Sequence, residues 1–314
     1  MTREAHFRAM GSDAHVVVVG GRADALDRAR SHIDALEQRW SRFLPTSEVS
    51  ALNALAGAAV QVSDDTALLV RTALAAIRLT GGSFDPTVLG AMVRAGYDRS
   101  FDELARTPVH TSRCGLVLGA DGIEIDGNVV RLPEGVGFDP GGIGKGLAAD
   151  LVAHVALDDG VAGIAVNLGG DVRVAGESSS GGGWTIAIDH PWSREPIVHV
   201  GLVDGAVATS TTLLRAWTLG GTPRHHVIDP ATGAPSTTDL TLASVVSAAG
   251  WTSEVLAKAV LLRGAAHPFD LLGGTPCDAL AVGRDGRVQT TAGFERFTGG
   301  RAPTDVIPSQ EVFA

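Results

Sequence analysis

Helix-like and strand-like patterns occupy different parts of this chain of 314 residues. Long amphipathic helices are predicted early, at 23–43 and 64–84, and again late, at 253–264, where Gly264 would end the helix. A doubly wound parallel sheet needs strand and helix to alternate steadily, and this chain does not alternate. The order of patterns therefore predicts an α+β fold. The main strand-like stretches are 15–21, 163–176, 184–189, 197–210 and 240–250.

Turn and cap residues mark shorter elements between these patterns. The pair Gly127-Asn128 predicts a hairpin, and Asp285-Gly286 predicts another nearer the end of the chain. Ser47 is expected to cap a short helix, because a serine hydroxyl can accept from the free N–H groups of the first turn. The stretch after residue 84 is rich in loop-forming residues.

The composition is that of a globular protein, with 45% apolar and 19% charged residues. We see no fixed-period repeat and no low-complexity linker, so we expect a single domain over residues 1–314. The formal net charge is -10 and the basic residues are scattered. A basic face for nucleic acid or for an anionic membrane is therefore not expected.

Targeting signals and cysteine usage suggest the compartment. The first residues lack the apolar run of a signal peptide, and no apolar window of about 18 residues predicts a membrane span. The cysteines, Cys114 and Cys277, lie far apart and outside any metal-binding spacing. Buried free thiols in a reducing cytosol are expected, and with them a cytoplasmic location.

A glycine-rich stretch, GFDPGGIGKGLAAD at 137–150, looks like a phosphate-binding loop. It fails as a P-loop, because Gly146 stands where Ser or Thr is required, and as a Rossmann loop, because Leu147 replaces the third glycine. Consecutive glycines can nonetheless turn backbone N–H groups toward an anion, at the positive end of a helix that starts near Gly144. A glycine-rich packing turn is the alternative, and the loop alone does not separate the two.

Three other stretches also join glycines to acidic residues, and the ordered set resembles one family. Each alone is an ordinary turn pattern. Together with the glycine-rich stretch they resemble the ApbE family of FAD:protein FMN transferases, over roughly residues 8–270. The matching segments are Met10-Gly11-Ser12, RFLPTSEVSALN (42–53), GGSFDPTVLG (81–90), FDPGGIGKGLAAD (138–150), VNLGGDVRVAG (166–176), VATS (207–210), HVIDPATGAP (226–235) and EVLAKAVLLRG (254–264).

The resemblance implies a fold and an activity. It implies two lobes of helices and mixed or antiparallel sheets, with FAD bound in a cleft between them. Members of the family move FMN from FAD to a threonine or serine hydroxyl of a target protein, release AMP and use Mg²⁺. The implied partners are thus FAD and a flavin-accepting protein.

Matching positions also imply roles for individual residues. Those expected to line the flavin or adenine sites are Met10, Phe43, Ser83, Phe84 and Asp85. In the glycine-rich stretch, Asp139 would meet FAD, the Gly142 carbonyl would face the metal, and Lys145 would meet phosphate. His226 is the candidate for orienting the phosphate or handling the proton. A turn-stabilising hydrogen bond is the equal alternative for His226 and Asp229.

The last helix departs from the family pattern. Members usually carry Asp and, four residues later, Thr as metal ligands, and these positions match Glu254 and Lys258 here. Glutamate can ligate Mg²⁺, so Glu254 is the candidate metal ligand and catalytic residue, whereas a protonated lysine cannot ligate. Lys258 is either the partner of Glu254 in a helix-surface ion pair or a positive charge at the pyrophosphate in place of the metal.

Three activities are therefore considered for the chain. The first is FMN transfer from FAD to a protein hydroxyl. The second is FAD binding without transfer, as a flavin carrier or sensor, which the lysine at a metal-ligand position favours. The third is metal-assisted hydrolysis of FAD to FMN and AMP.

Overall fold

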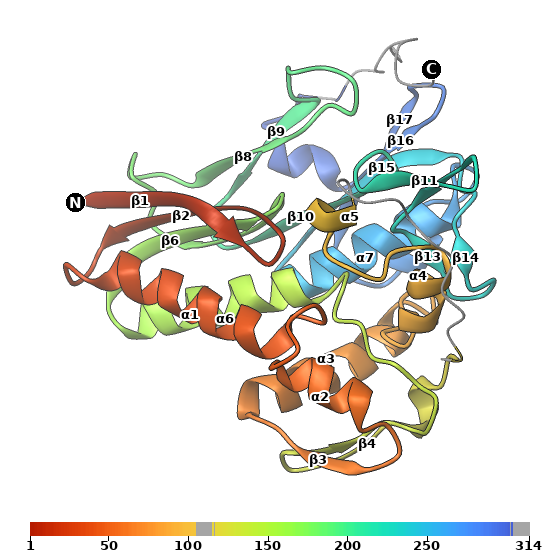
Figure 1. Ribbon diagram of the computed structural model, residues 1–314. Coiled ribbons are helices and arrows are strands. Elements are labelled where there is room, and N and C mark those ends of the chain that lie inside the picture. Colours follow the sequence, from red (N-terminus) through yellow and green to blue (C-terminus); the bar gives the residue numbers. More distant parts are fainter. Residues whose placement is uncertain (105–114, 116, 302, 304–314) are drawn as a thin grey trace.

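An eight-stranded antiparallel sheet forms the centre of the fold, which is described by a computed structural model for residues 1–104, 115, 117–301 and 303 (Figure 1). Neighbouring strands are antiparallel throughout, in the order β1-β2-β6-β7-β10-β15-β16-β17. With helices packed on this sheet, the expected α+β class is confirmed. The strands are β1 (Thr2–Ala9), β2 (Ser12–Gly20), β6 (Val161–Leu168), β7 (Asp171–Gly176), β10 (Gly205–Thr211), β15 (Leu240–Ser247), β16 (Asp278–Gly283) and β17 (Val288–Thr290).

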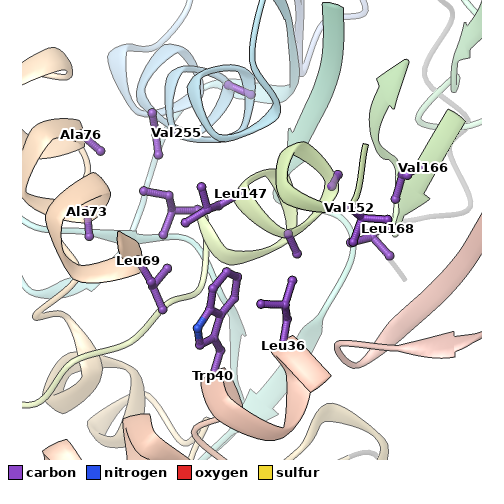
Figure 2. Packing of buried hydrophobic residues seen from close by; sticks show 14 of the residues in the cluster. Leu36, Trp40, Leu69, Ala73, Ala76, Leu147, Val152, Val166, Leu168 and Val255 are labelled. Carbon is purple, nitrogen blue, oxygen red and sulfur yellow. The ribbon is translucent and has the colours of Figure 1, made fainter. Parts of the chain in front are cut away.

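Three long helices, α1, α6 and α7, cover one face of the sheet, and α3 packs against them on the side away from the sheet (Figures 1 and 2). Helix α6 lies in the middle of this layer, where its Leu147 and Val152 are buried among side chains from α1, α3, α7 and β6, such as Trp40 and Val255. The helix that follows the glycine-rich stretch is thus held rigidly on most of its sides. The helices are α1 (Ala25–Trp40), α2 (Glu48–Ala54), α3 (Asp64–Leu79), α4 (Leu89–Arg94), α5 (Phe101–Leu104), α6 (Gly144–Asp158) and α7 (Gly250–Arg263).

The opposite face of the sheet carries a separate hydrophobic cluster under a hairpin of β8 (Trp184–Ile188) and β9 (Val198–Leu202). Strand β15 lies between this cluster and α7, and each of its eight residues is buried. Burial on both faces explains why its sequence reads as a nearly continuous run of small and apolar residues instead of alternating.

Small sheets and caps complete the fold. Ser47 accepts from the Ser50 N–H at 3.0 Å and caps α2, as expected, and Gly264 ends α7, as expected. Both predicted hairpins form, β4 with β5 and β16 with β17. The minor sheets are β3 (Ala59–Gln61) with β5 (Val129–Arg131) and β4 (Glu124–Asp126), β11 (Ala216–Leu219) with β12 (Thr222–His225), and β13 (Ile228–Asp229) with β14 (Ala234–Pro235).

Two stretches expected as single strands are pairs of strands. The stretch 163–176 folds back on itself as β6 and β7, because Gly169 and Gly170 adopt positive φ angles of 66° and 93° and form a two-residue hairpin turn. The stretch 197–210 divides into β9 and β10, which belong to different sheets. Strand β1 and helix α4, the latter within the expected loop-rich stretch, went unpredicted.

Helices α6 and α7 cross at a pair of glycines. A Cβ placed on Gly146 would lie 2.4 Å from the backbone carbonyl carbon of Gly250, so the two backbones touch at this point. The Asp150 carboxylate of α6 accepts from the N–H groups of Gly250 at 2.7 Å and Trp251 at 3.0 Å, which satisfies the first turn of α7. The crossing therefore brings the beginning of α6 and the first turns of α7 together.

Cys277 is a buried free thiol, as expected, whereas Cys114 lies outside the described residues. In the part of the chain that the structure describes, no helix is long and apolar enough to cross a membrane.

Candidate functional site

The segment before α6, residues 137–143 and here named the glycine loop, is shaped by Asp139. The Asp139 side chain is almost fully buried, its Oδ1 accepts from the Gly141 N–H at 2.8 Å, and its backbone N–H donates to the Pro86 carbonyl at 2.7 Å. Its Oδ2 lies 3.4 Å from Nε of Arg42, whose side chain is also buried. A buried carboxylate with a partner and hydrogen bonds holds the loop in one conformation.

Arg42 links the glycine loop to two aromatic rings. Its guanidinium lies 4.2 Å from the ring centroid of Phe43 and 4.8 Å from that of Tyr97, within cation–π distance. Phe43 itself is 36% exposed, which leaves part of its ring free to contact a ligand. The motif 42–53 thus contributes an ion pair as well as an aromatic surface.

Lys145 lies in the first turn of α6, between two buried carboxylates. Its ammonium forms an ion pair with Asp171, at the start of β7, and lies 3.6 Å from Oε1 of Glu254 on α7. The other oxygen of Glu254 accepts from the Gly146 N–H at 2.7 Å. Burial lowers the pKa of Lys145, and the nearby Glu254 opposes this shift. The crossing of the two helices therefore places an ammonium group at the positive end of α6.

Lys258 reaches from α7 to the glycine loop. Its Nζ donates to the Gly141 carbonyl at 2.9 Å and lies 5.4 Å from the centroid of the buried Phe84 ring. Burial lowers the pKa of Lys258, while Asp139 and Glu254 favour its charged form. The alternative of a helix-surface ion pair is wrong for these two described residues, because Glu254 is buried and contacts Lys145 and Gly146 instead.

The chain contains two lysines, and both lie in this site. All its other cationic side chains, apart from histidine, are arginines. A lysine ammonium is a compact charge with three donors, which fits a narrow space beside carbonyl oxygens better than a planar guanidinium does.

His226 has no hydrogen-bond partner for its buried Nδ1 among the described residues. Burial lowers its pKa well below the ordinary value, and the positive charges of Arg215 and Lys258 lower it further. His226 is therefore neutral near pH 7 and able to accept a proton. The neighbouring His225 makes the hydrogen bonds of this turn, through Nδ1 to the Val227 N–H and through Nε2 to the Ser236 carbonyl.

Asp229 takes the turn-stabilising role that was its alternative. Its Oδ1 accepts from the Ala231 N–H at 2.9 Å, and its carbonyl accepts from the Gly233 N–H at 2.8 Å. The first is the hydrogen bond of an Asx turn, and the second closes the backbone turn. In the turn that contains His226, in contrast, the neighbouring His225 makes the hydrogen bonds.

The turn between β1 and β2 approaches Lys145 from another side. Met10 and Gly11 have positive φ angles of 50° and 65°, an uncommon conformation for methionine. Arg215 holds this turn, donating to the Gly11 carbonyl at 3.1 Å and to the Ser12 hydroxyl at 2.8 Å. A Cβ on Gly169 would lie 2.7 Å from Ser12 and 3.9 Å from the Lys145 side chain, so the turn and the lysine are neighbours.

The segment 83–85 is only partly available for a ligand. Phe84 is buried, and its N–H donates to the Thr80 hydroxyl at 3.0 Å. Asp85 Oδ1 accepts from both the N–H and the hydroxyl of Thr87, at 2.7 and 2.6 Å, and Ser83 is partly buried. Phe84 joins the site through Lys258, whereas ligand contacts of Ser83 and Asp85 stay predictions.

Three residues of this arrangement were given no role from the sequence. Arg42 and Asp171 lie inside the motifs 42–53 and 166–176, where an arginine next to an aromatic residue and an acid after two glycines were the available signals. Arg215 lies outside every matching segment, and its positive φ of 51° is visible only in the structure.

A glycine loop at a helix N-terminus, two partly buried lysines and a neutral histidine define this as an α+β protein with a site suited to a phosphate-bearing ligand. The comparison with known families makes the class specific. The model of the ApbE family matches residues 10–280, and the chain belongs to this family.

Individual relatives agree with this membership. The FAD:protein FMN transferase of Treponema pallidum is 33% identical over 301 residues, which cover 86% of this chain and 80% of the relative. That of Vibrio cholerae is 26% identical and covers 84% of this chain and 79% of its own length. The crystal structure of the ApbE protein of Thermotoga maritima superposes with a TM-score of 0.85 at 25% identity, over 95% of this chain and 99% of that one. The flavinyl transferase of Pseudomonas stutzeri, with a TM-score of 0.80 at 22% identity over 96% and 98% of the two chains, shares the fold.

The neutral His226 predicts a specific dependence of stability on pH. The pKa of His226 is lower in the folded protein than in the unfolded chain, so the unfolded chain binds more protons below about pH 6.5. The stability that this histidine contributes is therefore present above that pH and lost as the pH falls. Compared with the wild type, His226→Gln should lose less stability between about pH 7 and pH 5, measured as denaturant midpoints.

The exposed His199 on β9 provides the control. His199→Gln should give a curve of midpoint against pH that runs parallel to that of the wild type. Parallel curves for His226→Gln and the wild type would contradict a buried neutral imidazole at position 226.

Proposed function

We propose that this protein transfers FMN from FAD to a threonine or serine hydroxyl of an acceptor protein and releases AMP. The observation that carries the proposal is the position of Lys145, an ammonium group between two buried carboxylates at the start of α6, beside the glycine loop. The proposal is supported by membership of the ApbE family. It is also supported by relatives named FAD:protein FMN transferase, which align with most of this chain.

The reaction breaks a phosphoanhydride bond and forms a phosphoester bond. The acceptor oxygen forms a bond to the FMN-side phosphorus of the pyrophosphate, the bond from that phosphorus to the AMP oxygen breaks, and the hydroxyl proton leaves. The barrier depends mainly on negative charge at the phosphoryl oxygens, which donors placed in advance can stabilise. The Lys145 ammonium, at the positive end of α6, supplies such a donor.

Other residues have proposed roles in binding and proton transfer. His226, neutral and with an unpartnered buried Nδ1, receives the hydroxyl proton. Asp139 orders the glycine loop around the ligand, and Glu254 orients Lys145. The FAD contacts proposed from the resemblance are those of Met10, Phe43, Ser83, Phe84, Asp85, Asp139 and Lys258.

The residues do not fit the Mg²⁺ that the resemblance implies. Both oxygens of Glu254 already have partners, in the Gly146 N–H and the Lys145 ammonium. The Lys258 ammonium lies at the glycine loop next to Gly142, where its charge would repel a divalent cation. Ligation by Gly142 and Glu254 is therefore not part of this proposal, and no step is assigned to a metal.

Covalent labelling of an acceptor tests the function. The protein is incubated with FAD and with an acceptor protein that carries a threonine. Flavin fluorescence should remain on the acceptor in a denaturing gel, and AMP should be released in equal amount. The control acceptor carries alanine at the threonine. Bound FAD without labelling of several acceptors would contradict transfer and favour a flavin carrier, and AMP release without acceptor would indicate hydrolysis.

Three further features complete the proposal as predictions. The chain is expected to act as a single domain with its FAD in a cleft between two lobes. A cytoplasmic location, and with it a cytoplasmic acceptor, is also expected. Nucleic acid is not among the expected partners, because the net charge is -10.

A further inference from the structure

The glycine loop is shaped around the end of the Lys258 side chain. A Cβ on Gly142 would lie 2.0 Å from the Lys258 Nζ, and the φ of Gly142 is 96°. No other residue type could therefore occupy position 142 without displacing the ammonium. The hydrogen bond from Nζ to the Gly141 carbonyl fixes the same end of the side chain at 2.9 Å.

The surroundings of this ammonium are those of a cation site. A backbone carbonyl accepts from it, the carboxylates of Asp139 and Glu254 act on it electrostatically, and the face of the Phe84 ring lies 5.4 Å away. Carbonyl and carboxylate oxygens are the groups with which proteins bind hard divalent cations. Here the same types of group face a positive charge that is covalently part of the chain.

We propose that the Lys258 ammonium is the fixed cation of this site and takes the place of a divalent metal, so that FAD binding needs no metal ion. The inference rests on the proposed function for the identity of the ligand. Among the described residues, the Gly141 carbonyl uses one of the three N–H donors of this ammonium, which leaves two to meet phosphoryl oxygens. Lys258 and Lys145, the two lysines of the chain, would then contact the pyrophosphate from α7 and from α6.

Two replacements of Lys258 separate the loss of its charge from the gain of a metal ligand. Lys258→Thr removes the charge and adds a hydroxyl oxygen that a hard cation can use, whereas Lys258→Met removes the charge and adds no hard ligand. Arg263→Thr removes a positive charge from an exposed position on the same helix and is the matched control. Denaturant midpoints confirm that each variant is folded.

The first measurement uses Mn²⁺ alone, as a paramagnetic probe for a Mg²⁺-type site, without FAD. The wild type and Lys258→Met should leave Mn²⁺ free, and Lys258→Thr should bind it at least about tenfold more tightly than the wild type. Tight binding of Mn²⁺ by the wild type at this site, abolished by Glu254→Gln, would overturn the proposal.

The second measurement is the dissociation constant for FAD, by flavin fluorescence, with chelator and with millimolar Mg²⁺. The wild type and Arg263→Thr should give equal constants in both buffers. Both Lys258 variants should bind at least about tenfold more weakly in chelator, and Mg²⁺ should restore binding only to Lys258→Thr. Wild-type binding strengthened tenfold by Mg²⁺, or Lys258→Met binding as tightly as the wild type, would overturn the inference.

The two measurements keep this inference distinct from the proposed function. If the wild type binds FAD in neither buffer, the proposed function is contradicted, while the Mn²⁺ result still decides the role of Lys258. With isotope-labelled lysine, the protein has only two side-chain signals, and the one lost in Lys258→Thr should shift on addition of FAD in chelator. A signal that does not shift when FAD binds would overturn the contact with Lys258.

Discussion

Lys145→Met is expected to lower the rate of FMN transfer about 10²–10³-fold and to destabilise the folded protein by about 3–5 kcal/mol. The rate falls because a donor aimed at the developing phosphoryl charge is lost. The fold loses stability because the carboxylates of Asp171 and Glu254, both almost fully buried, would remain without the ammonium that lies between them. Transfer rates with saturating FAD and denaturant-induced unfolding measure the two effects.

A double variant separates the catalytic effect from the structural one. In Lys145→Met with Asp171→Asn, one of the two unpaired charges is removed, so much of the lost stability should return. The transfer rate should stay low, because the donor to the phosphate is still missing. Recovery of both stability and rate in the double variant would show that Lys145 is only a counter-ion of Asp171, and would contradict its proposed role.

Most elements of the fold could be predicted because their patterns are local. The long helices carry a buried stripe, as in α1 with Ile33, Leu36 and Trp40, and their ends carry cap residues such as Ser47. Segregation of helices and strands along the chain was sufficient for the α+β class. Strand β1 was missed because exposed polar residues alternate with small or partly buried ones in it, which is a weak hydrophobic signal for an edge strand.

The site could be predicted in part because its motifs lie at the ends of elements. Lys145, Asp139 and Gly142 belong to one contiguous stretch, so the resemblance identified them together. The carboxylate partner of Lys145 on β7 and the arginine partner of Asp139 come from distant segments. Such pairings depend on tertiary packing, which periodicity and spacing do not encode.

The outcome for Glu254 and Lys258 shows how tertiary packing decides between local alternatives. Residues four apart on a helix usually pair on its surface. In α7 these positions face α6 and the glycine loop, because Gly146 and Gly250 allow the two helices to touch. Each side chain therefore finds its partner on the other helix or in the loop, and neither is free for the surface pair.

Gly146→Ala is expected to destabilise the protein by at least about 2 kcal/mol and to weaken FAD binding. Its Cβ would lie 2.4 Å from the backbone carbon and oxygen of Gly250, and backbone atoms cannot move aside as a flexible side chain can. Separation of the helices would also break the 2.7 Å hydrogen bond from the Gly146 N–H to Glu254. Denaturant-induced unfolding and FAD titration measure the two effects.

Gly144→Ala, two residues earlier on the same helix, is the matched control. A Cβ at position 144 makes only an ordinary contact of 3.5 Å with Pro140, and alanine favours the helix over glycine by about 1 kcal/mol. This variant should be at least as stable as the wild type and should bind FAD equally well. Equal tolerance of alanine at 144 and 146 would contradict a direct backbone contact between α6 and α7. The positions of Glu254 and Lys258 in the site would then need another explanation, because both depend on that contact.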